Sequence, residues 1–177
     1  MESETSNETL KTIFTRHSVR RFLPGETVPE TILETVCRAA MSAPSACNKQ
    51  MWRFVVVSAR ADLDAMLEFL PNAKMLKEAG AAIVVCGVPD GDVGFYWQQD
   101  CSAATENALL ALHSLGYGAC WCGLYPREER AAAAAKFLGI PDGVVPMALL
   151  AIGKPDPASG EKPKDKWDPE KIHRGRW

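Results

Sequence analysis

The densest group of chemically useful side chains lies in residues 16–22, Arg-His-Ser-Val-Arg-Arg-Phe. In an extended segment successive side chains alternate, so we expect Arg16, Ser18 and Arg20 on one side and Val19 and Phe22 near the other. Two guanidinium groups beside a hydroxyl suit a phosphate, because each guanidinium presents a planar pair of donors. The alternative is a solvated basic turn that buries Phe22 in the core.

A second segment, residues 42–52, is small and polar and reads Ser-Ala-Pro-Ser-Ala-Cys-Asn-Lys-Gln-Met-Trp. Its small residues let the backbone approach a flat ligand closely. Ser45, Asn48 and Gln50 offer hydroxyl and amide groups to the edge of a heterocycle. An ordinary loop between a helix and a strand is the alternative, and neither segment decides the matter by itself.

The rest of the sequence offers no acid–base or metal-binding set. The histidines, His17, His113 and His173, are far apart, and no Gly-x-Ser-x-Gly elbow is present. We expect His17 to pack or to bond to backbone, and we assign no catalytic side chain. The six cysteines lie in apolar segments and are expected to be buried thiols of a cytosolic protein. Residues 120–122 form a Cys-x-Cys without a second Cys or His pair nearby, so we expect no metal there.

Composition limits the kind of protein this can be. The chain has 177 residues, 47% of them hydrophobic, which is enough for the core of one domain spanning residues 1–177. The formal net charge of −2 argues against the global basic field of a nucleic-acid-binding protein. No run of about 18 apolar residues could span a membrane, and the polar start of the chain is unlike a signal peptide. We therefore expect a cytoplasmic protein with no nucleic-acid or membrane partner.

Hydrophobic periodicity predicts the elements that hold these segments in place. Ser6 or Asn7 should cap a short helix at 9–14, and a capping box at Thr27–Glu30 should open the helix before residues 42–52. Further helices are predicted at 63–70, 93–115 and 127–138, the last ended by Gly139. Apolar runs predict strands at 53–57, 81–88 and 144–152, and another strand should follow Gly116.

Two regions suggest contacts beyond one chain. The long helix at 93–115 has only a thin polar face, and its alanines could pack against a second copy of itself. The last segment, 154–177, is rich in Pro, Lys, Asp and Glu, which is typical of a disordered tail. However, Trp167, Ile172 and Trp177 are spaced apolar anchors that a free tail would not need.

Taken together, these motifs resemble those of the FMN-dependent nitroreductase family. Arg-x-Ser-x-Arg-x-Phe at 16–22 and Ser-Ala-Pro-Ser-x-x-Asn-x-Gln-x-Trp at 42–52 stand in the family's order, on either side of one helix. Residues 116–123 are similar to the family's Gly-x-Gly-x-Cys-Trp-x-Gly segment. One departure is Met51, where the family usually has proline. The likeness extends from Arg16 to Trp167.

The resemblance implies an α+β, nitroreductase-like fold, with a central mixed sheet flanked by helices and a C-terminal extension exchanged across a homodimer. Residues 154–177 would then be an arm that packs on the partner subunit. The implied activity is that of an FMN-dependent NAD(P)H oxidoreductase that reduces nitro compounds, quinones or similar small acceptors. The reaction would be a ping-pong hydride transfer through flavin N5, in which the cofactor carries the chemistry.

The resemblance also implies which residues bind the cofactor. The contacts expected from the N-terminal segment and the tail are Arg16, His17, Ser18, Arg20, Lys164 and Lys166. Among them Arg16, Ser18 and Lys166 should hold the phosphate. Arg20 should lie by the N1/O2 edge of the flavin or help the phosphate. Lys166 stands where arginine is usual, and it lacks the bidentate fork.

The ring contacts implied by the family come from other parts of the chain. Those expected from the partner subunit are Pro44, Ser45, Ala46, Asn48 and Gln50. The backbone of Gly123 and Leu124 should face the N5 edge, where an N–H group stabilises the reduced ring. Lys74 either reaches the ring or is a solvated surface lysine.

Two other functions stay open. Reductive dehalogenation and flavin fragmentation use the same fold, but they generally need an added lid or extra active-site residues, and no long insertion is present. A non-enzymatic flavin- or nucleotide-binding module is the remaining possibility.

Overall fold

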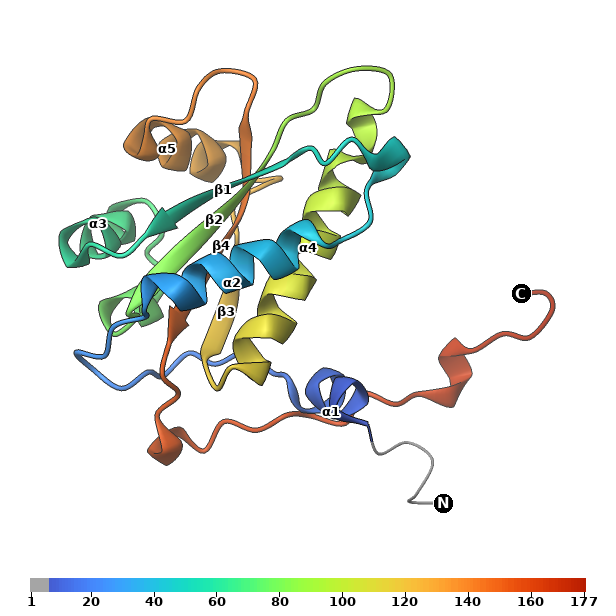
Figure 1. The fold of residues 1–177 in the computed structure, drawn as a ribbon, viewed down its shortest axis with the longest axis horizontal. Coiled ribbons are helices and arrows are strands. Elements are labelled where there is room, and N and C mark those ends of the chain that lie inside the picture. The colour runs from blue at the N-terminus through green and yellow to red at the C-terminus, as the bar shows by residue number, and fades with distance from the viewer. Residues whose placement is uncertain (1–6) are drawn as a thin grey trace.

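The computed structural model describes residues 7–177 and has a four-stranded sheet at its centre (Figure 1). The strands are β1 (Trp52–Val57), β2 (Ala81–Gly87), β3 (Gly118–Gly123) and β4 (Val145–Gly153). Their order in the sheet is β1-β2-β4-β3, so β2 and β4 are interior strands. Every residue of β2 is buried, which confirms the central strand predicted from the apolar run at 81–88.

The strand pairings differ from the expected mixed sheet. All three pairings between the named strands are antiparallel. The parallel pairing found among the described residues is one isolated bridge, between Ser18 and Ala119 of β3. Pro146 lies at the beginning of β4 opposite Cys86, where the register shifts, because proline lacks the N–H that a regular ladder requires.

Helices cover both faces of the sheet. On one face α2 (Glu30–Met41) and α4 (Trp97–Ser114) cross each other (Figure 1). The other face is covered by α3 (Arg60–Ala65), α5 (Glu128–Leu138) and the short 3-10 turns η2 (Met66–Glu68) and η3 (Lys74–Lys77). Successive side chains of a strand pack alternately into the two apolar layers, as those of Ile83 and Val84 of β2 do.

The first helix, α1 (Glu8–Thr15), lies outside these layers, beside α4. It begins at Asn7, whose side chain accepts a backbone hydrogen bond at 2.8 Å from the first turn. Ser6, the other predicted cap, lies outside the described residues. No residue of α1 is buried, and Ile13 and Phe14 are 45% and 68% exposed. The apolar face predicted for this helix is therefore uncovered in a single chain.

Several local predictions need correction. No side chain caps α2, so the predicted capping box is wrong; Pro29 is the N-cap, and its carbonyl accepts two backbone hydrogen bonds. The long helix begins as a 3-10 turn, η4 (Gly94–Tyr96), and becomes regular at Trp97. All six thiols are free, but the prediction that they are buried is wrong for Cys47, which is exposed. The tail has two short 3-10 turns, η5 (Pro157–Ser159) and η6 (Pro169–Lys171).

Candidate functional site

The segment 16–22 is anchored to β3 by its apolar side. The Val19 N–H donates to the Ala119 carbonyl at 2.9 Å, and Val19 and Phe22 are buried. Gly118 permits this approach, because a Cβ atom there would lie 2.7 Å from the Cβ of Val19. The predicted burial of Val19 and Phe22 is confirmed, but strict alternation ends at Arg20 and Arg21, which are both exposed; Arg16 and Ser18 are half-buried.

Arg16 is held in place rather than extended into bulk water. Its Nε lies 3.1 Å from a carboxylate oxygen of Glu106 on α4, and its side chain is only 18% exposed. Glu106 is 47% exposed, so water screens the pair and an incoming anion can compete for the guanidinium. The pair therefore positions Arg16 before any ligand arrives.

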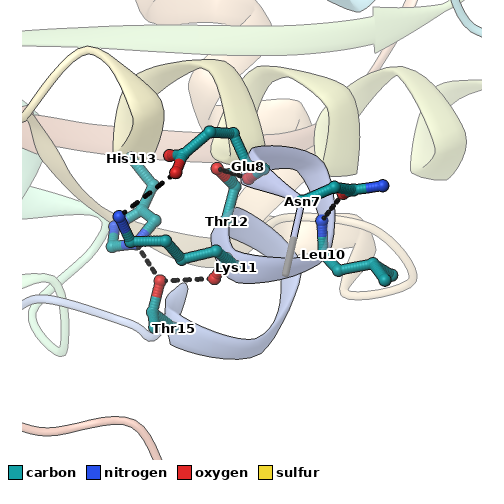
Figure 2. A network of polar contacts seen from close by, with 7 residues as sticks. All are labelled: Asn7, Glu8, Leu10, Lys11, Thr12, Thr15 and His113. Carbon is teal, nitrogen blue, oxygen red and sulfur yellow. Dashed lines mark hydrogen bonds and ion pairs between the residues drawn. The ribbon is translucent and has the colours of Figure 1, made fainter. Parts of the chain in front are cut away.

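A short polar network joins α1 to the end of α4 (Figure 2). The Thr15 hydroxyl donates to the Lys11 carbonyl at 2.7 Å and lies 2.8 Å from His113 Nε2. Because that hydroxyl proton points to Lys11, Nε2 is the donor and carries the proton of the neutral ring. Burial, followed by the charges of His17 and Arg16, lowers the pKa of His113 below its ordinary value of 6.5. His17 Nδ1 lies 3.0 Å from the Thr15 carbonyl oxygen, which confirms a backbone-bonding role.

The tail returns along the N-terminal segment of the same chain. The Asp156 N–H donates to the Arg21 carbonyl at 3.0 Å. The Glu161 carboxylate then accepts a hydrogen bond from the Arg20 N–H, also at 3.0 Å. These bonds bring two regions from opposite ends of the sequence side by side.

A groove of about 1020 Å³ opens between this segment and the tail. The predicted cofactor residues that line it are Arg16, His17, Ser18, Arg20, Lys164 and Lys166. We call this space the basic groove. Its apolar rim consists of the exposed side chains of Ile13, Phe14 and Trp167. The fold therefore assembles every cofactor residue predicted from the two ends of the chain.

A smaller hollow of about 200 Å³ adjoins the groove at Arg20, which lines both spaces. This side hollow lies between β3 and parts of residues 70–75. Gly123 belongs to its lining, and a side chain there would meet nothing closer than the Tyr125 carbonyl oxygen at 3.9 Å. The space beside Gly123 is therefore open to a ligand.

Residues 44–50 form a tight turn elsewhere in the chain. Cys47, Asn48 and Gln50 have positive φ angles of 48°, 54° and 51°, which are unfavourable for residues other than glycine. The Gln50 N–H donates to the Ser45 hydroxyl at 3.0 Å, and its side-chain amide donates to Asn48 at 3.0 Å. Such backbone persists only where the surroundings fix it, and it presents its polar groups in a set arrangement.

Asp100, near the start of α4, fixes this turn. Its Oδ1 accepts the Ala46 N–H at 3.0 Å, the residue is 5% exposed, and Oδ2 has no hydrogen-bond partner among residues 7–177. Thr15 contacts α4 at His113, thirteen positions later and about 20 Å further along the helix axis. Figure 1 accordingly shows the turn and α1 at opposite ends of α4. The predicted partner-subunit contacts line neither the basic groove nor the side hollow.

A sequence model of the nitroreductase family matches residues 13–84 and 70–154. The chain belongs to the nitroreductase family. An Archaeoglobus fulgidus protein, provisionally named NADH dehydrogenase/NAD(P)H nitroreductase, is 45% identical over 173 residues, which cover 96% of this chain and 99% of that protein. The predicted family is therefore confirmed.

Solved structures agree with the nitroreductase fold. A crystal structure from Bacteroides thetaiotaomicron with the same provisional name has a TM-score of 0.91 and 44% identity, covering 98% of this chain and 100% of the other. A Bacteroides fragilis nitroreductase with bound FMN has a TM-score of 0.77 and 25% identity, covering 95% and 98%. The α+β fold predicted from the sequence is confirmed.

One predicted contact of the nitroreductase cofactor, Leu124, and the open case of Lys74 need a closer look. Leu124 is fully buried, and its N–H donates to the Met147 carbonyl at 2.9 Å. The donor role predicted for it is therefore already taken within the chain, and Gly123 is the member of the pair that lines the hollow. Lys74 is exposed, and its two neighbours rather than Lys74 itself line the hollow.

Sequence reasoning missed some residues of the site. Asn72 lines the side hollow together with Arg20. Glu106 and Glu161 position the basic segment, and Asp100 positions the turn. Because single carboxylates on a helix or in a tail are normally solvated, their types and spacing gave no signal.

Two classes of feature are missing from the part of the chain that the structure describes. No group of three or more His, Cys, Asp and Glu side chains there is arranged to hold a metal ion. In the same residues no helix combines the length and apolar character needed to cross a membrane.

Proposed function

We propose that this nitroreductase-family chain is an FMN-dependent NAD(P)H oxidoreductase that reduces nitro compounds, quinones or similar small acceptors in a ping-pong cycle. The observation that carries the proposal is the place of Arg20, which lines both the basic groove and the side hollow. One cation thus stands between a space suited to a phosphate and a space suited to a flat ring. The bound FMN of the Bacteroides fragilis relative supports this cofactor, and the name of the Archaeoglobus fulgidus relative supports NAD(P)H.

The basic groove fits the phosphate of FMN. Arg16 and Arg20 supply guanidinium groups, and the tail adds the ammonium groups of Lys164 and Lys166. Charge-assisted hydrogen bonds of this kind are shorter and stronger than neutral ones. Without a ligand, Glu106 holds the Arg16 guanidinium in place. A phosphate with two negative charges would compete with that single carboxylate for the guanidinium.

The side hollow fits the edge of the ring. When bound, FMN supplies the hydride-transfer chemistry. Arg20 places a positive charge beside the ring and thereby favours the negative charge that reduction adds. Gly123 lets the backbone approach the ring closely, and Asn72 offers an amide to its polar edge. The chain would need only to bind FMN, orient its ring and shield it from water, which agrees with the lack of an acid–base set in the sequence.

We also propose that two copies of the chain complete the site. The turn with the predicted ring contacts lies at the far end of α4 from the basic groove, so a second copy would supply it. Several large apolar side chains are exposed to solvent in a single chain: Phe14 is 68%, Trp167 70% and Trp177 99% exposed. Exposed apolar groups on this scale mark a surface that another chain covers. Residues 154–177 were predicted to be an arm on the partner subunit, but residues 154–161 are bonded to their own chain, so only the part beyond them, with Trp167 and Trp177, would pack on the partner.

The test is an FMN titration followed by reduction without oxygen. We expect the purified protein to be a dimer that takes up FMN and becomes yellow. Its flavin absorbance should bleach with NADH or NADPH and return when a nitro compound or quinone is added. Protein that takes up no FMN would contradict the proposal. Protein that binds FMN but is reduced by neither nicotinamide would be a binding module, and halide release from a halogenated acceptor would indicate dehalogenation.

A further inference from the structure

Three residues with sulfur in their side chains line the side hollow. Cys120 and Cys122 are two positions apart on β3, so their side chains point to the same face of the sheet. The Sγ of Cys122 lies 4.0 Å from the Sδ of Met75, which η3 brings to the same hollow. The sequence predicted no metal at this Cys-x-Cys because a second Cys or His pair was missing, but the fold adds a thioether.

The spacing suits a bridging cation better than a disulfide. The Cα atoms of alternate strand residues are about 6.6–6.8 Å apart, which is the far limit for a disulfide. A three-coordinate cation with metal–sulfur distances of about 2.3 Å holds its sulfur atoms about 4.0 Å from one another. The Cys122–Met75 separation of 4.0 Å matches one of the three sulfur–sulfur distances in that arrangement.

Cysteine binds a metal ion as the thiolate, so the site would form with loss of both thiol protons. A bound cation would displace the protons of Cys120 and Cys122 as H⁺, and its binding would therefore weaken as the pH falls.

We propose that Cys120, Cys122 and Met75 bind a soft monovalent cation, with Cu(I) as the chemical type. Thiolate and thioether sulfur select such ions, whereas Mg²⁺ and Ca²⁺ prefer oxygen. Two thiolates and one monovalent cation leave a net charge of −1. Arg20 and Arg130 both line the hollow, so the total charge would be +1 with a monovalent ion and +2 with a divalent one, which favours the monovalent ion. The site lies in the same hollow as the proposed contacts of the flavin edge, so bound FMN could compete with the cation, but cation binding does not require FMN.

The test is a competition titration with Cu(I) itself. The full-length protein, with its thiols reduced and oxygen excluded, is titrated against a chromogenic Cu(I) chelator, both with and without added FMN. We expect one Cu(I) per chain to be taken from the chelator. Because loss of even an outer-shell partner costs about 10–100-fold in metal affinity, C120S, C122S and M75L should each weaken binding at least about tenfold.

The controls separate this site from the other thiols. C37S removes a half-buried cysteine on α2, far from the hollow in sequence, and should bind Cu(I) as the wild type does. M75L keeps the side-chain size, so its fold is expected to survive, and circular dichroism checks each variant. Wild-type affinity in M75L and C122S, or an equal loss in C37S, would overturn the proposal. A protein that binds no FMN still reports on Cu(I), so the two proposals fail separately.

Discussion

The basic groove and the 44–50 turn differ in how the chain holds them. One chain forms the whole groove, because the segment 16–22 bonds to β3 and the tail returns along that segment. The turn stands at the opposite end of α4, and three of its non-glycine residues have positive φ angles. Asp100 ties it to that helix through the Ala46 N–H.

This difference teaches how a cofactor site can be divided. The groove gathers charge on long side chains, which can adjust to an anion. The turn presents hydroxyl and amide groups on backbone that its surroundings hold in an unfavourable conformation. A site that used both would need two copies of the chain, because one chain keeps them at the two ends of an 18-residue helix.

The largest expected effect comes from separating the two regions onto different chains. One variant lacks the groove cations (R16A with R20A), and the other lacks the turn amides (N48A with Q50A). Each variant alone should lose most of its FMN binding. When the two are co-expressed equally, about a quarter of the wild-type sites should return, because half of randomly paired dimers are mixed and each mixed dimer holds one intact site.

The measurement is an FMN titration of the purified mixture, with each variant co-expressed with a differently tagged copy of itself as control. A site contained in one chain predicts no recovery at all, because every site in a mixed dimer would then have one defect. That result would contradict a site shared between two chains, since the groove of one chain and the turn of the other would no longer bind one cofactor.

A smaller effect is expected from a single groove residue. R16A should weaken FMN binding about tenfold to a hundredfold, because a charge-assisted contact is worth roughly 1.5–3 kcal/mol. R21A is the matched control: Arg21 is exposed, lies 3.5 Å from Asp156 and is not part of the groove lining. The measurement is an FMN titration of both variants. Unchanged binding in R16A would refute the phosphate role, and equal losses would indicate a general charge effect.

The turn offers the complementary test. D100A removes the buried acceptor of the Ala46 N–H, so the turn should loosen and FMN affinity should fall about tenfold, as for a lost hydrogen bond to a charged group. D100N keeps an oxygen acceptor and should restore most of that affinity. If D100N were as weak as D100A while both stayed folded, the negative charge rather than the hydrogen bond would be what the turn needs.

Local features of both regions could be predicted from the sequence. The burial of Val19 and Phe22, the apolar run of β2 and the helix stop at Gly139 each depend on neighbouring residues, and the structure confirms them. The resemblance to the nitroreductase family grouped residues from both ends of the chain, and the structure places them along one groove, while their contact with a cofactor stays a prediction. The prediction that Cys47 is buried was wrong, because its backbone is in a left-handed turn that exposes the thiol.

Tertiary contacts could not be predicted in the same way. Arg16 meets Glu106, and Arg20 meets Glu161, across long stretches of sequence, and no local pattern marks either carboxylate. The predicted capping box failed because Pro29 takes the N-cap position. Met75 gave no signal as a neighbour of the Cys-x-Cys, because a methionine in a short turn is normally a packing residue.

The smallest expected effect concerns pH at the groove end of α4. H113Q keeps an N–H donor for Thr15 but cannot be protonated. The pKa of His113 lies below 6.5 in the folded chain, so the unfolded chain takes up this proton at higher pH. The corresponding stability is present above pH 6.5 and is lost as the pH falls from 6.5 through the lowered pKa. Denaturant unfolding should therefore show a steeper acid loss of free energy for the wild type than for H113Q. The partial exposure of His113 keeps the difference small, and parallel pH profiles would show that another group titrates at this end of the helix.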